Sequence, residues 1–382
     1  MRVDWMKKSV GLVLLSIVLL AGCNVFEGEQ TLDQIDAPPE DAKVTDDIEN
    51  VGETDEAGED LDESEGAEEG TEEETDAEAD DETEGEEASG TLSHVLYLMD
   101  QNGLVVPQEM ELPAPASKEV AKQVLQYLVQ DGPVTAMLPS GFQAVLPAGT
   151  EIIDLNLEED GTMVVNVSEE FANYQAEDED KIIESMTHTL TEFKNVDRVK
   201  LWINGEEQQT MPVNGTPLTQ GYSRDEGINV HQATGIDLME SEAATLYFPM
   251  QGDEMVYFVP VTQHIEMDQD QTEQSIVQAL MEGPAFDLPL ENYINHGSEL
   301  TAAPTLDDGT LSLTFNENIL SNSEKGVIAD EVLQSIVLTL TEQEGVQAVQ
   351  VSVEDHQEVI NEEGQPYTEP VTREMVTPAK SI

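Results

Sequence analysis

The sequence contains 382 residues, carries a formal net charge of −68 and has a single cysteine, Cys23. One thiol excludes an intrachain disulfide and a zinc site built from several thiolates. Phosphate groups repel so acidic a chain, so neither nucleic acid nor anionic lipid is an expected partner.

The first 22 residues have the features of a secretory signal. Basic residues precede an apolar run at 10–20, which is shorter than the roughly 20 residues that a membrane span needs. Residues 20–23 read Leu-Ala-Gly-Cys and resemble a bacterial lipobox, whose cysteine sulfur receives diacylglycerol. We therefore expect residues 1–22 to be a lipoprotein signal peptide and Cys23 to anchor the chain on the outer face of the cytoplasmic membrane. The alternative is an ordinary secreted protein.

An acidic segment follows the cysteine. Between Asn24 and Gly90 there are 30 Asp or Glu residues and one Lys. Such a segment buries too little apolar surface to offset the entropy lost on ordering. We predict that residues 23–91 form a disordered tether that holds the folded part away from the membrane. The alternative is an acidic arm that binds a basic partner or cations.

A first folded unit is predicted at 92–213. Helical spacing of apolar residues, alternation in strands and an Asp-Gly turn indicate a strand, a helix, a hairpin, a second helix and a last strand. The expected ranges are, in that order, 95–98, 117–131, 152–167, 178–193 and 199–203.

The same order recurs about 150 residues later. Residues 185–199 and 335–349 align without a gap, and seven of fifteen positions are identical, including Thr-Leu-Thr-Glu at 189–192 and 339–342. An internal repeat of this length indicates one structural unit used twice. The expected second-unit ranges are 245–248, about 272–282, a hairpin turning at 308–309, about 327–343 and 349–353.

These elements predict an α+β fold of two tandem β-α-β-β-α-β units, each a small sheet with helices on one face. The second unit is assigned to 243–358. Residues 214–242, with Gly, Pro and Asn, are interpreted as an interdomain linker, and 359–382 as a polar C-terminal tail.

No catalytic, cofactor-binding or metal-binding residue is predicted. The histidines show no metal-ligand spacing; they are His94, His188, His231, His264, His296 and His356. Residues 156–161 resemble part of a calcium loop, but a hairpin turn explains them equally well. The repeated Thr-Leu-Thr-Glu is interpreted as a helix end, with Leu190 and Leu340 inward and the Thr and Glu residues at the surface or capping locally.

Several repeated motifs together resemble the GerM family of sporulation and spore-germination lipoproteins. They are Leu-Tyr-Phe at 246–248 and more weakly Leu-Tyr-Leu at 96–98, Gly-Pro at 132–133 and 283–284, and Leu-Pro-x-Gly-Thr at 146–150, degenerate at 294–298. The Asp-Gly hairpins and the Leu-Thr-x-x-x-x-Val-x-x-Val turns complete the pattern. The resemblance covers the lipobox and both units, and the acidic tether lies outside it.

The resemblance implies a fold similar to the ring-building modules of sporulation secretion complexes, and a non-enzymatic role between mother cell and forespore. The expected partners are the membrane, through Cys23, and extracytoplasmic sporulation or cell-envelope proteins. The first hypothesis is a lipid-anchored scaffold that supports channel assembly, cortex peptidoglycan or germination. The alternatives are a cell-wall glycan-binding module, which would need an aromatic platform, and a peptidoglycan hydrolase, which would need a carboxylate cleft.

Overall fold

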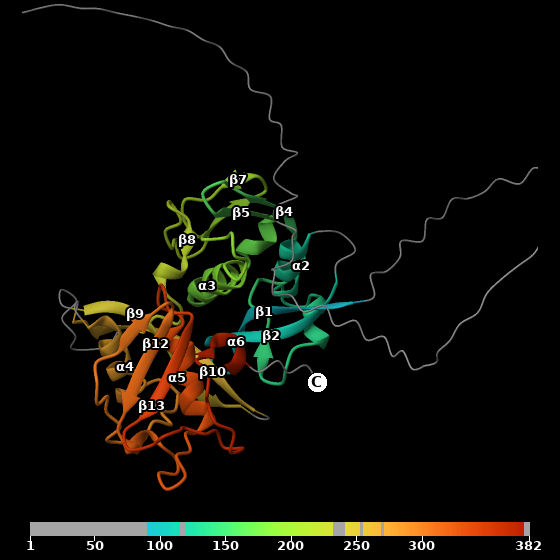
Figure 1. Cartoon of the computed structure of the whole chain (residues 1–382). Coiled ribbons are helices and arrows are strands. Elements are labelled where there is room, and N and C mark those ends of the chain that lie inside the picture. The colour runs from blue at the N-terminus through green and yellow to red at the C-terminus, as the bar shows by residue number, and fades with distance from the viewer. Residues whose placement is uncertain (1–89, 115–118, 232–240, 253–254, 269–270, 378–382) are drawn as a thin grey trace, which may run out of the picture.

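The computed structural model describes residues 90–114, 119–231, 241–252, 255–268 and 271–377 (Figure 1). Two α+β units are present, as the sequence predicts. We call residues 90–226 unit one, residues 241–377 unit two, and residues 227–231 the connecting segment. The residues predicted to be a signal peptide, Cys23 and almost all of the predicted acidic tether lie outside the described residues.

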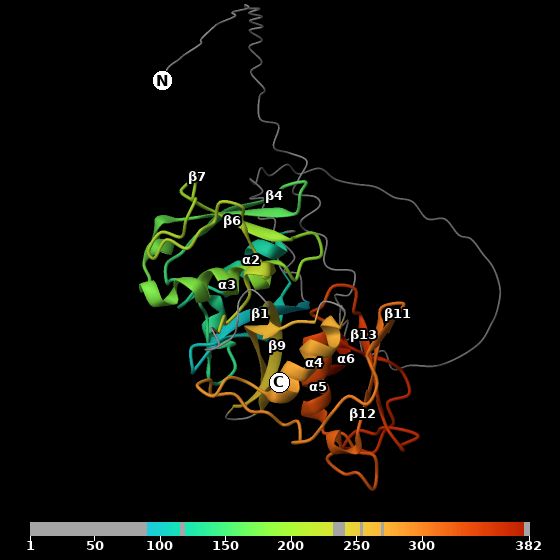
Figure 2. The ribbon, with the colours of Figure 1, turned by 90° about the vertical axis from the view of Figure 1, so that its left-hand side faces the viewer.

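Unit one has three layers. Its helices lie between an opening hairpin, β1–β2, and a sheet built on β4, β5 and β6 (Figures 1 and 2). The strands are β1 Thr91–Asp100, β2 Val105–Pro113, β3 Phe142–Gln143, β4 Ile152–Leu157, β5 Thr162–Val167, β6 Arg198–Ile203, β7 Glu206–Glu207 and β8 Tyr222–Ser223. The helices are α2 Val120–Tyr127 and α3 Glu179–Leu190, with 3-10 turns at Pro133–Ala136, Glu169–Ala172, Ala176–Asp178 and Arg224–Glu226.

The sequence explains the main elements of this unit. Ile182, Ile183, Met186 and Leu190 recur at helical spacing on α3 and are all buried, so they give the helix an apolar face. Strand β5 is buried along its whole length, because it lies between β4 and β6 and beneath the helices. It pairs antiparallel with β4 and parallel with β6, and α3 makes the crossover that a parallel pair requires.

Unit two repeats this arrangement. Its strands are β9 Ser241–Gln251, β10 Val256–Glu266, β11 Thr305–Asp307, β12 Thr310–Phe315, β13 Ala348–Val353 and β14 Val371–Thr372. Its helices are α4 Thr272–Glu282, α5 Asp330–Leu340 and α6 Arg373–Val376, with a 3-10 turn at Glu317–Ile319. Strands β9 and β10 form the opening hairpin, and β12 pairs parallel with β13. Figure 2 shows α4 and α5 between β9 and the sheet of β11, β12 and β13.

Each unit opens with a hairpin where the sequence predicts a single strand. The missed strands are β2 and β10, and each contains a proline, Pro107 or Pro260. Proline is rare in central strands because it lacks an N–H. Here Pro107 lies opposite Tyr97 and Pro260 lies opposite Tyr247. Both tyrosines direct their backbone N–H away from the proline, toward a helix, and the Tyr97 carbonyl accepts from Ser185 Oγ at 2.5 Å on the same side. Each proline therefore lies at a position of the hairpin where the facing tyrosine does not turn its backbone N–H toward it.

The residues assigned to a linker and to a tail contain strands that complete the sheets. Within 214–242, β8 pairs with β6 through Val199 and Tyr222. Within 359–382, β14 pairs with β13 through Val349 and Val371. The interpretation as plain linker and tail is therefore wrong for these parts, because each short strand adds an edge to its own unit.

The Thr-Leu-Thr-Glu repeat joins each second helix to its opening hairpin. Thr189 and Thr339 are buried, and their Oγ1 atoms accept the backbone N–H of Tyr97 at 3.0 Å and of Tyr247 at 2.9 Å. Leu190 and Leu340 are buried as predicted. The prediction that the Thr and Glu residues lie at the surface or cap locally is therefore wrong for the first threonine of each pair. The second threonine, Thr191 or Thr341, does bond locally, to a carbonyl one turn earlier. Glu342 is not at the surface, since its side chain is only 17% exposed.

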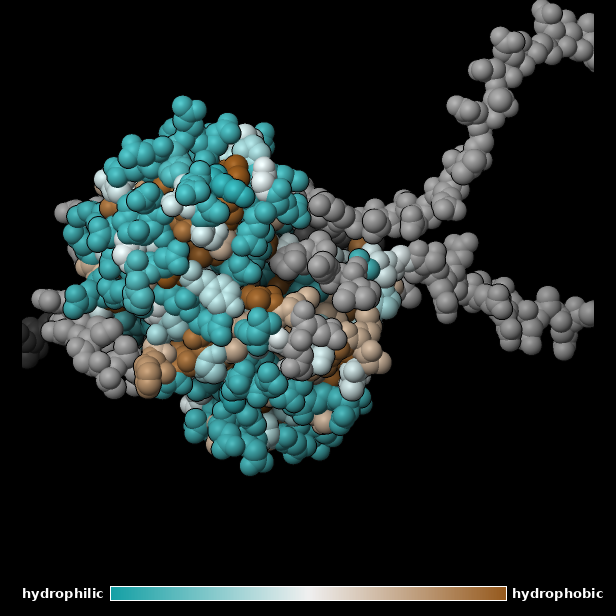
Figure 3. Space-filling view, turned by 90° about the horizontal axis from the view of Figure 1, so that it is seen from below, coloured by the Kyte–Doolittle hydropathy of each residue, from teal (hydrophilic) through white to brown (hydrophobic). Residues whose placement is uncertain are grey.

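The cores of the two units touch at their hairpins. Val106 of β2 belongs to the hydrophobic cluster of unit two, and β2 contacts β10. Figure 3 shows one face of the molecule, which is mostly hydrophilic with small hydrophobic areas near its middle. In the part of the chain that the structure describes, no helix has the length and apolarity needed to cross a bilayer.

Replacing Thr339 by Val should destabilise the protein. Valine has nearly the same shape but no acceptor, so the buried N–H of Tyr247 would lose its partner at a cost of about 1–3 kcal/mol. Urea unfolding of the full chain measures this change. Thr339→Ser keeps the acceptor and serves as the control, and equal stability of the Val and Ser variants would contradict the assigned role.

Candidate functional site

Six side chains meet where the two units touch, and we call them the inter-unit cluster. Each unit contributes one tyrosine, one glutamate and one arginine; they are Tyr97, Glu192 and Arg224 from unit one and Tyr247, Glu342 and Arg373 from unit two. Each tyrosine lies in the first strand of its hairpin, each glutamate just after the second helix, and each arginine just after the short edge strand. Each unit therefore contributes the same three positions of the fold to the cluster.

The arginines pair unequally with the glutamates. Arg224 pairs with Glu192 of its own unit and reaches across to Glu342 at 3.1 Å. Arg373 pairs with Glu342 at 3.0 Å and donates to the hydroxyl of Tyr247 at 2.6 Å. Glu342 is therefore held by both arginines, and its side chain is only 17% exposed, against 38% for Glu192.

The tyrosine rings and hydroxyls complete the cluster. Arg224 lies 5.7 Å from the centre of the Tyr97 ring, and Arg373 lies 4.9 Å from that of Tyr247, close enough for a cation–π interaction. The hydroxyls of Tyr97 and Tyr247 donate to Glu192 and Glu342 at 3.2 and 3.1 Å. Each glutamate thus accepts from its own tyrosine as well as from arginine.

The groups of the cluster keep the same protonation states around neutral pH. Burial would raise the pKa of Glu342, but Arg373 and Arg224 outweigh burial and hold its pKa below the ordinary value. Burial raises the pKa of Tyr247 to about 12, although Arg373 opposes this. Nearby His188 is buried, and burial lowers its pKa to about 3. At neutral pH Glu342 is therefore ionised while Tyr247 and His188 are uncharged, an arrangement suited to holding the units together.

The connecting segment is bound to both units. Ile228 and His231 bond to Thr262 of β10: Ile228 N donates to Thr262 Oγ1, Thr262 N to Ile228 O, and His231 N to Thr262 O, each at 2.9 Å. The Asn229 side chain accepts from Val105 N at 2.8 Å and donates to Val105 O at 2.7 Å and to Pro260 O at 2.8 Å. Asn229 therefore hydrogen-bonds β2 of unit one and β10 of unit two at once.

Gly227 makes this close approach feasible. Its φ is +87°, and a Cβ atom there would come within 2.8 Å of the Thr262 side chain. Only glycine combines this backbone conformation with the absence of a side chain. The chain can therefore leave Arg224 and enter the contact with β10 within three residues.

A buried carboxyl group supports the connecting segment from unit one. Glu184 on α3 is 4% exposed and accepts the backbone N–H of Asn229 at 3.1 Å. Burial raises the pKa of Glu184 to about 8, a rise that the hydrogen bond from Asn229 only partly offsets. Glu184 is therefore mostly protonated at neutral pH.

The candidate lipid and calcium sites that the sequence suggests lie in different parts of the chain. Cys23 lies outside the described residues, so its lipidation stays a prediction. Residues 156–161 form the end of β4 and the turn to β5, where Asp160 Oδ1 accepts from Thr162 N at 3.1 Å. Among the described residues, no group of three or more His, Cys, Asp or Glu is arranged to hold a metal ion.

The arginines of the inter-unit cluster were missed by sequence reasoning. They lie in segments interpreted as linker and tail, and arginine is scarce in this chain. The signal that could have found them is a further echo of the repeat: Ser223-Arg224 answers Thr372-Arg373, 149 positions later.

Comparison with known proteins gives a consistent result. A family described as "Germane: Sporulation and spore germination" matches residues 95–209 and 245–359. The chain is 40% identical to spore germination protein GerM of Bacillus subtilis (strain 168) over 362 residues, 94% of each protein. It is also similar to the solved tandem GerMN domains of the sporulation protein GerM from Bacillus subtilis. That match has a TM-score of 0.68 and 43% identity, and covers 74% of this chain and 97% of that one.

Replacing Glu342 by Gln should destabilise the protein more than replacing Glu192 by Gln. Glu342 is the more buried and compensates two arginines, so its loss should cost about 2–4 kcal/mol. The more exposed Glu192 should cost about 1 kcal/mol or less. Urea unfolding of the two variants compares equivalent positions of the repeat, and the reverse order would refute the central role of Glu342.

Stability should depend on pH through Glu184. Its pKa is higher in the folded chain, about 8, than in the unfolded chain, about 4.3. The folded state therefore holds a proton that the unfolded state has lost, and stability falls as pH rises between about 4.5 and 8. In Glu184→Gln this fall should shrink by about 3–5 kcal/mol. Urea unfolding at several pH values measures it, and identical pH profiles would rule out this contribution.

Proposed function

The chain belongs to the Germane family of sporulation and spore germination proteins, and we propose that it is a lipid-anchored, non-enzymatic docking protein on the outer face of the cytoplasmic membrane. In this proposal it presents its two units as one rigid body to other extracytoplasmic proteins. The process it serves is assembly of the channel between mother cell and forespore, or support of the cortex peptidoglycan.

The observation that carries the proposal is the joining of the two units. Arg224 crosses from unit one to Glu342 of unit two, and Tyr257 of β10 donates to Asp100 at the end of β1 at 2.8 Å. Phe142 packs edge-on against Tyr257, with ring centres 5.0 Å apart. Together, these polar and aromatic contacts would hold the two units in one orientation. A fixed orientation is useful when two surfaces must engage a partner together, since flexibility would add to the entropy cost of binding.

The polar groups of the inter-unit cluster favour docking over catalysis. Both glutamates are occupied by arginine and tyrosine partners, and an acid–base catalyst needs a group that can exchange a proton near the working pH. Glu184, with a pKa of about 8, could exchange one, but it is buried and hydrogen-bonded to the connecting segment. These carboxyl groups are therefore engaged in contacts within the protein.

The N-terminal sequence supports the anchored part of the proposal. The lipobox-like residues 20–23 place a cysteine after a signal-type apolar run, and a strongly acidic segment separates it from unit one. A lipid at Cys23 with a repelling, extended tether would hold the two units some distance from the bilayer. This geometry suits a protein that docks partners in the space outside the membrane.

Replacing Cys23 by Ser should release the protein from the membrane without unfolding it. The full-length protein and the C23S variant are expressed in sporulating cells, and each is followed by membrane fractionation and by crosslinking to neighbouring proteins. We expect the wild type in the membrane fraction, crosslinked to envelope proteins, and the variant in the soluble fraction. A wild type that fractionates as soluble would refute anchoring.

A second comparison separates docking from wall chemistry. The C23S variant is incubated with purified cell wall and, separately, with membrane extract from sporulating cells. Retention by envelope proteins is the result that docking predicts. Retention on the wall alone would favour a glycan-binding module, and cleavage of the wall would establish a hydrolase.

A further inference from the structure

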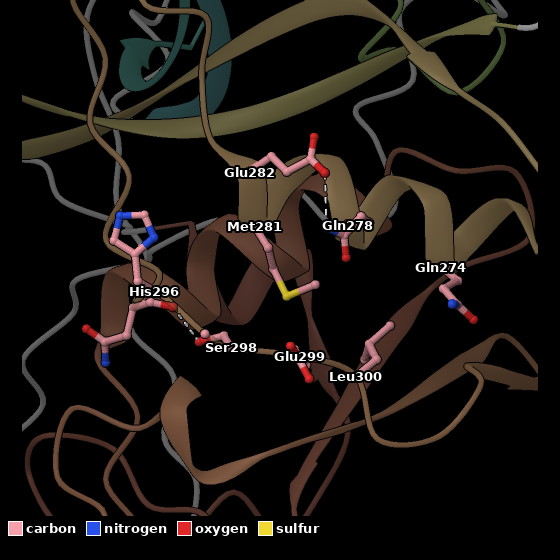
Figure 4. Close-up of a pocket in the computed structure, with 10 residues that line it drawn as sticks. Gln274, Gln278, Met281, Glu282, His296, Ser298, Glu299 and Leu300 are labelled. Carbon is pink, nitrogen blue, oxygen red and sulfur yellow. Dashed lines mark hydrogen bonds between the residues drawn. The ribbon is translucent and has the colours of Figure 1, made fainter.

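Unit two contains a surface pocket of about 590 Å³ between α4 and residues 295–300. Figure 4 shows Gln278 and Met281 pointing from α4 toward Ser298, Glu299 and Leu300 on the facing segment. The volume falls within the range of small-ligand sites. The pocket lies apart from the inter-unit cluster and shares no residue with it.

Unit one closes the corresponding place with backbone hydrogen bonds. There Val145 N and Leu146 N both donate to Leu128 O, at 3.0 and 2.8 Å, and Gln130 N donates to Leu146 O at 2.9 Å. Leu146 is fully buried. The segment after the first helix is thus bound directly to the end of α2.

In unit two the first helix, α4, is longer, and a side chain takes the place of these backbone hydrogen bonds. Helix α4 continues to Glu282, and Gly283, with a φ of +90°, ends it. The side chain of Asn292 fills the space beside Gly283 and donates to Met281 O at 3.0 Å. In unit two a side-chain bond from Asn292 thus stands where unit one has backbone bonds, and the pocket lies beside it.

The lining chemistry selects the ligand. The ten lining residues include no Lys or Arg, two acidic residues, Glu282 and Glu299, and one histidine, His296. An anion would be repelled by these carboxylates. Amide and hydroxyl groups come from Gln274, Gln278, Asn295 and Ser298, and apolar surface comes from Met281 and Leu300. Such a mixture suits an uncharged ligand that carries both hydroxyl groups and a small apolar group.

Part of this hydrogen-bonding capacity is already used, and part remains. Asn295 donates to Asn318 O and Leu320 O, Ser298 donates to Asn295 O, and Gln278 Nε2 donates to Glu282 Oε1. These bonds fix the walls. Among the described residues, neither the Gln278 carbonyl oxygen nor the Glu299 carboxylate accepts a hydrogen bond from another side chain, and both side chains are exposed to solvent. They remain as acceptors for the hydroxyl or amide N–H groups of a ligand.

We propose that this pocket binds an uncharged acetamido sugar of one or two rings. Sugar hydroxyls and the acetamido N–H would donate to Gln278 and Glu299, and the acetamido methyl group would lie against Met281 and Leu300. This binding does not rest on the docking function, because it uses a different surface and a different class of ligand. It relies on polar side chains and two apolar contacts, and not on the aromatic platform that a cell-wall glycan-binding module would need. Unit one, with its closed contact, has no part in it.

The test uses the full chain and the disaccharide of β1,4-linked N-acetylglucosamine as probe. Amide signals in NMR spectra of the labelled protein should shift for residues 274–282 and 295–300 as the sugar is added up to about 10 mM. In Gln278→Trp the indole fills the pocket, so the affinity should fall by about tenfold or more. Gln278→Ala, which removes the acceptor together with the amide group that bonds Glu282, should weaken binding by about fivefold.

The matched control is Gln126→Trp. Gln126 is an exposed glutamine on α2, the corresponding helix of unit one, so this variant should bind the probe as the wild type does. Thermal unfolding confirms that each variant is folded. The proposal is overturned if the wild type shows no shifts confined to these residues, or if Gln278→Trp and Gln278→Ala, both folded, bind the sugar unchanged. It is also overturned if glucuronic acid, an anionic sugar, binds as well as the probe.

Discussion

The arrangement of the two units depends on one carboxylate, that of Glu342. Two arginines converge on it, Arg373 from its own unit and Arg224 from the other. Two arginines on one carboxylate would by themselves leave one positive charge without a partner in a partly buried site. With Glu192 on the outer side of Arg224, the charges alternate and balance. The cluster can therefore be partly buried in a chain that is otherwise strongly acidic.

Duplication explains how such a cluster arises. The tyrosine, the glutamate and the arginine of each unit serve first to join the second helix, the hairpin and the edge strand of that unit. Because these groups lie at the surface that faces the other unit, pairing of two copies brings the equivalent groups together.

The two copies differ at the contact between the first helix and the segment that follows it. In unit one the segment containing Leu146 is bonded to the end of α2, whereas in unit two Asn292 takes over a similar bond and leaves a pocket. The inter-unit cluster and the hairpins are common to both copies. Structural contacts have thus been kept in both units, while the pocket occurs where one copy lost a backbone contact.

Local sequence patterns predicted those parts of the fold that depend on near neighbours. The apolar face of α3 ends in Leu190, and the Asp160-Gly161 turn joins β4 to β5, because helical spacing and turn chemistry act within a few residues. Strands β2 and β10 were missed because Pro107 and Pro260 interrupt the usual strand pattern, and only the helix opposite explains why proline fits. The cluster was missed because its arginines lie far along the chain from their partners, and the pocket because it results from tertiary spacing.

The most direct test of the account is the distance between the two units in solution. Spin labels at Glu159→Cys, in the turn after β4, and at Asp307→Cys, at the end of β11, are placed in the full chain with Cys23→Ser. The two positions are equivalent in the repeat and both are exposed. Double electron–electron resonance then measures the distribution of distances between them. The account predicts one narrow distribution, because the cluster and the connecting segment fix the units. A broad distribution, or several distances, would contradict a rigid two-unit body.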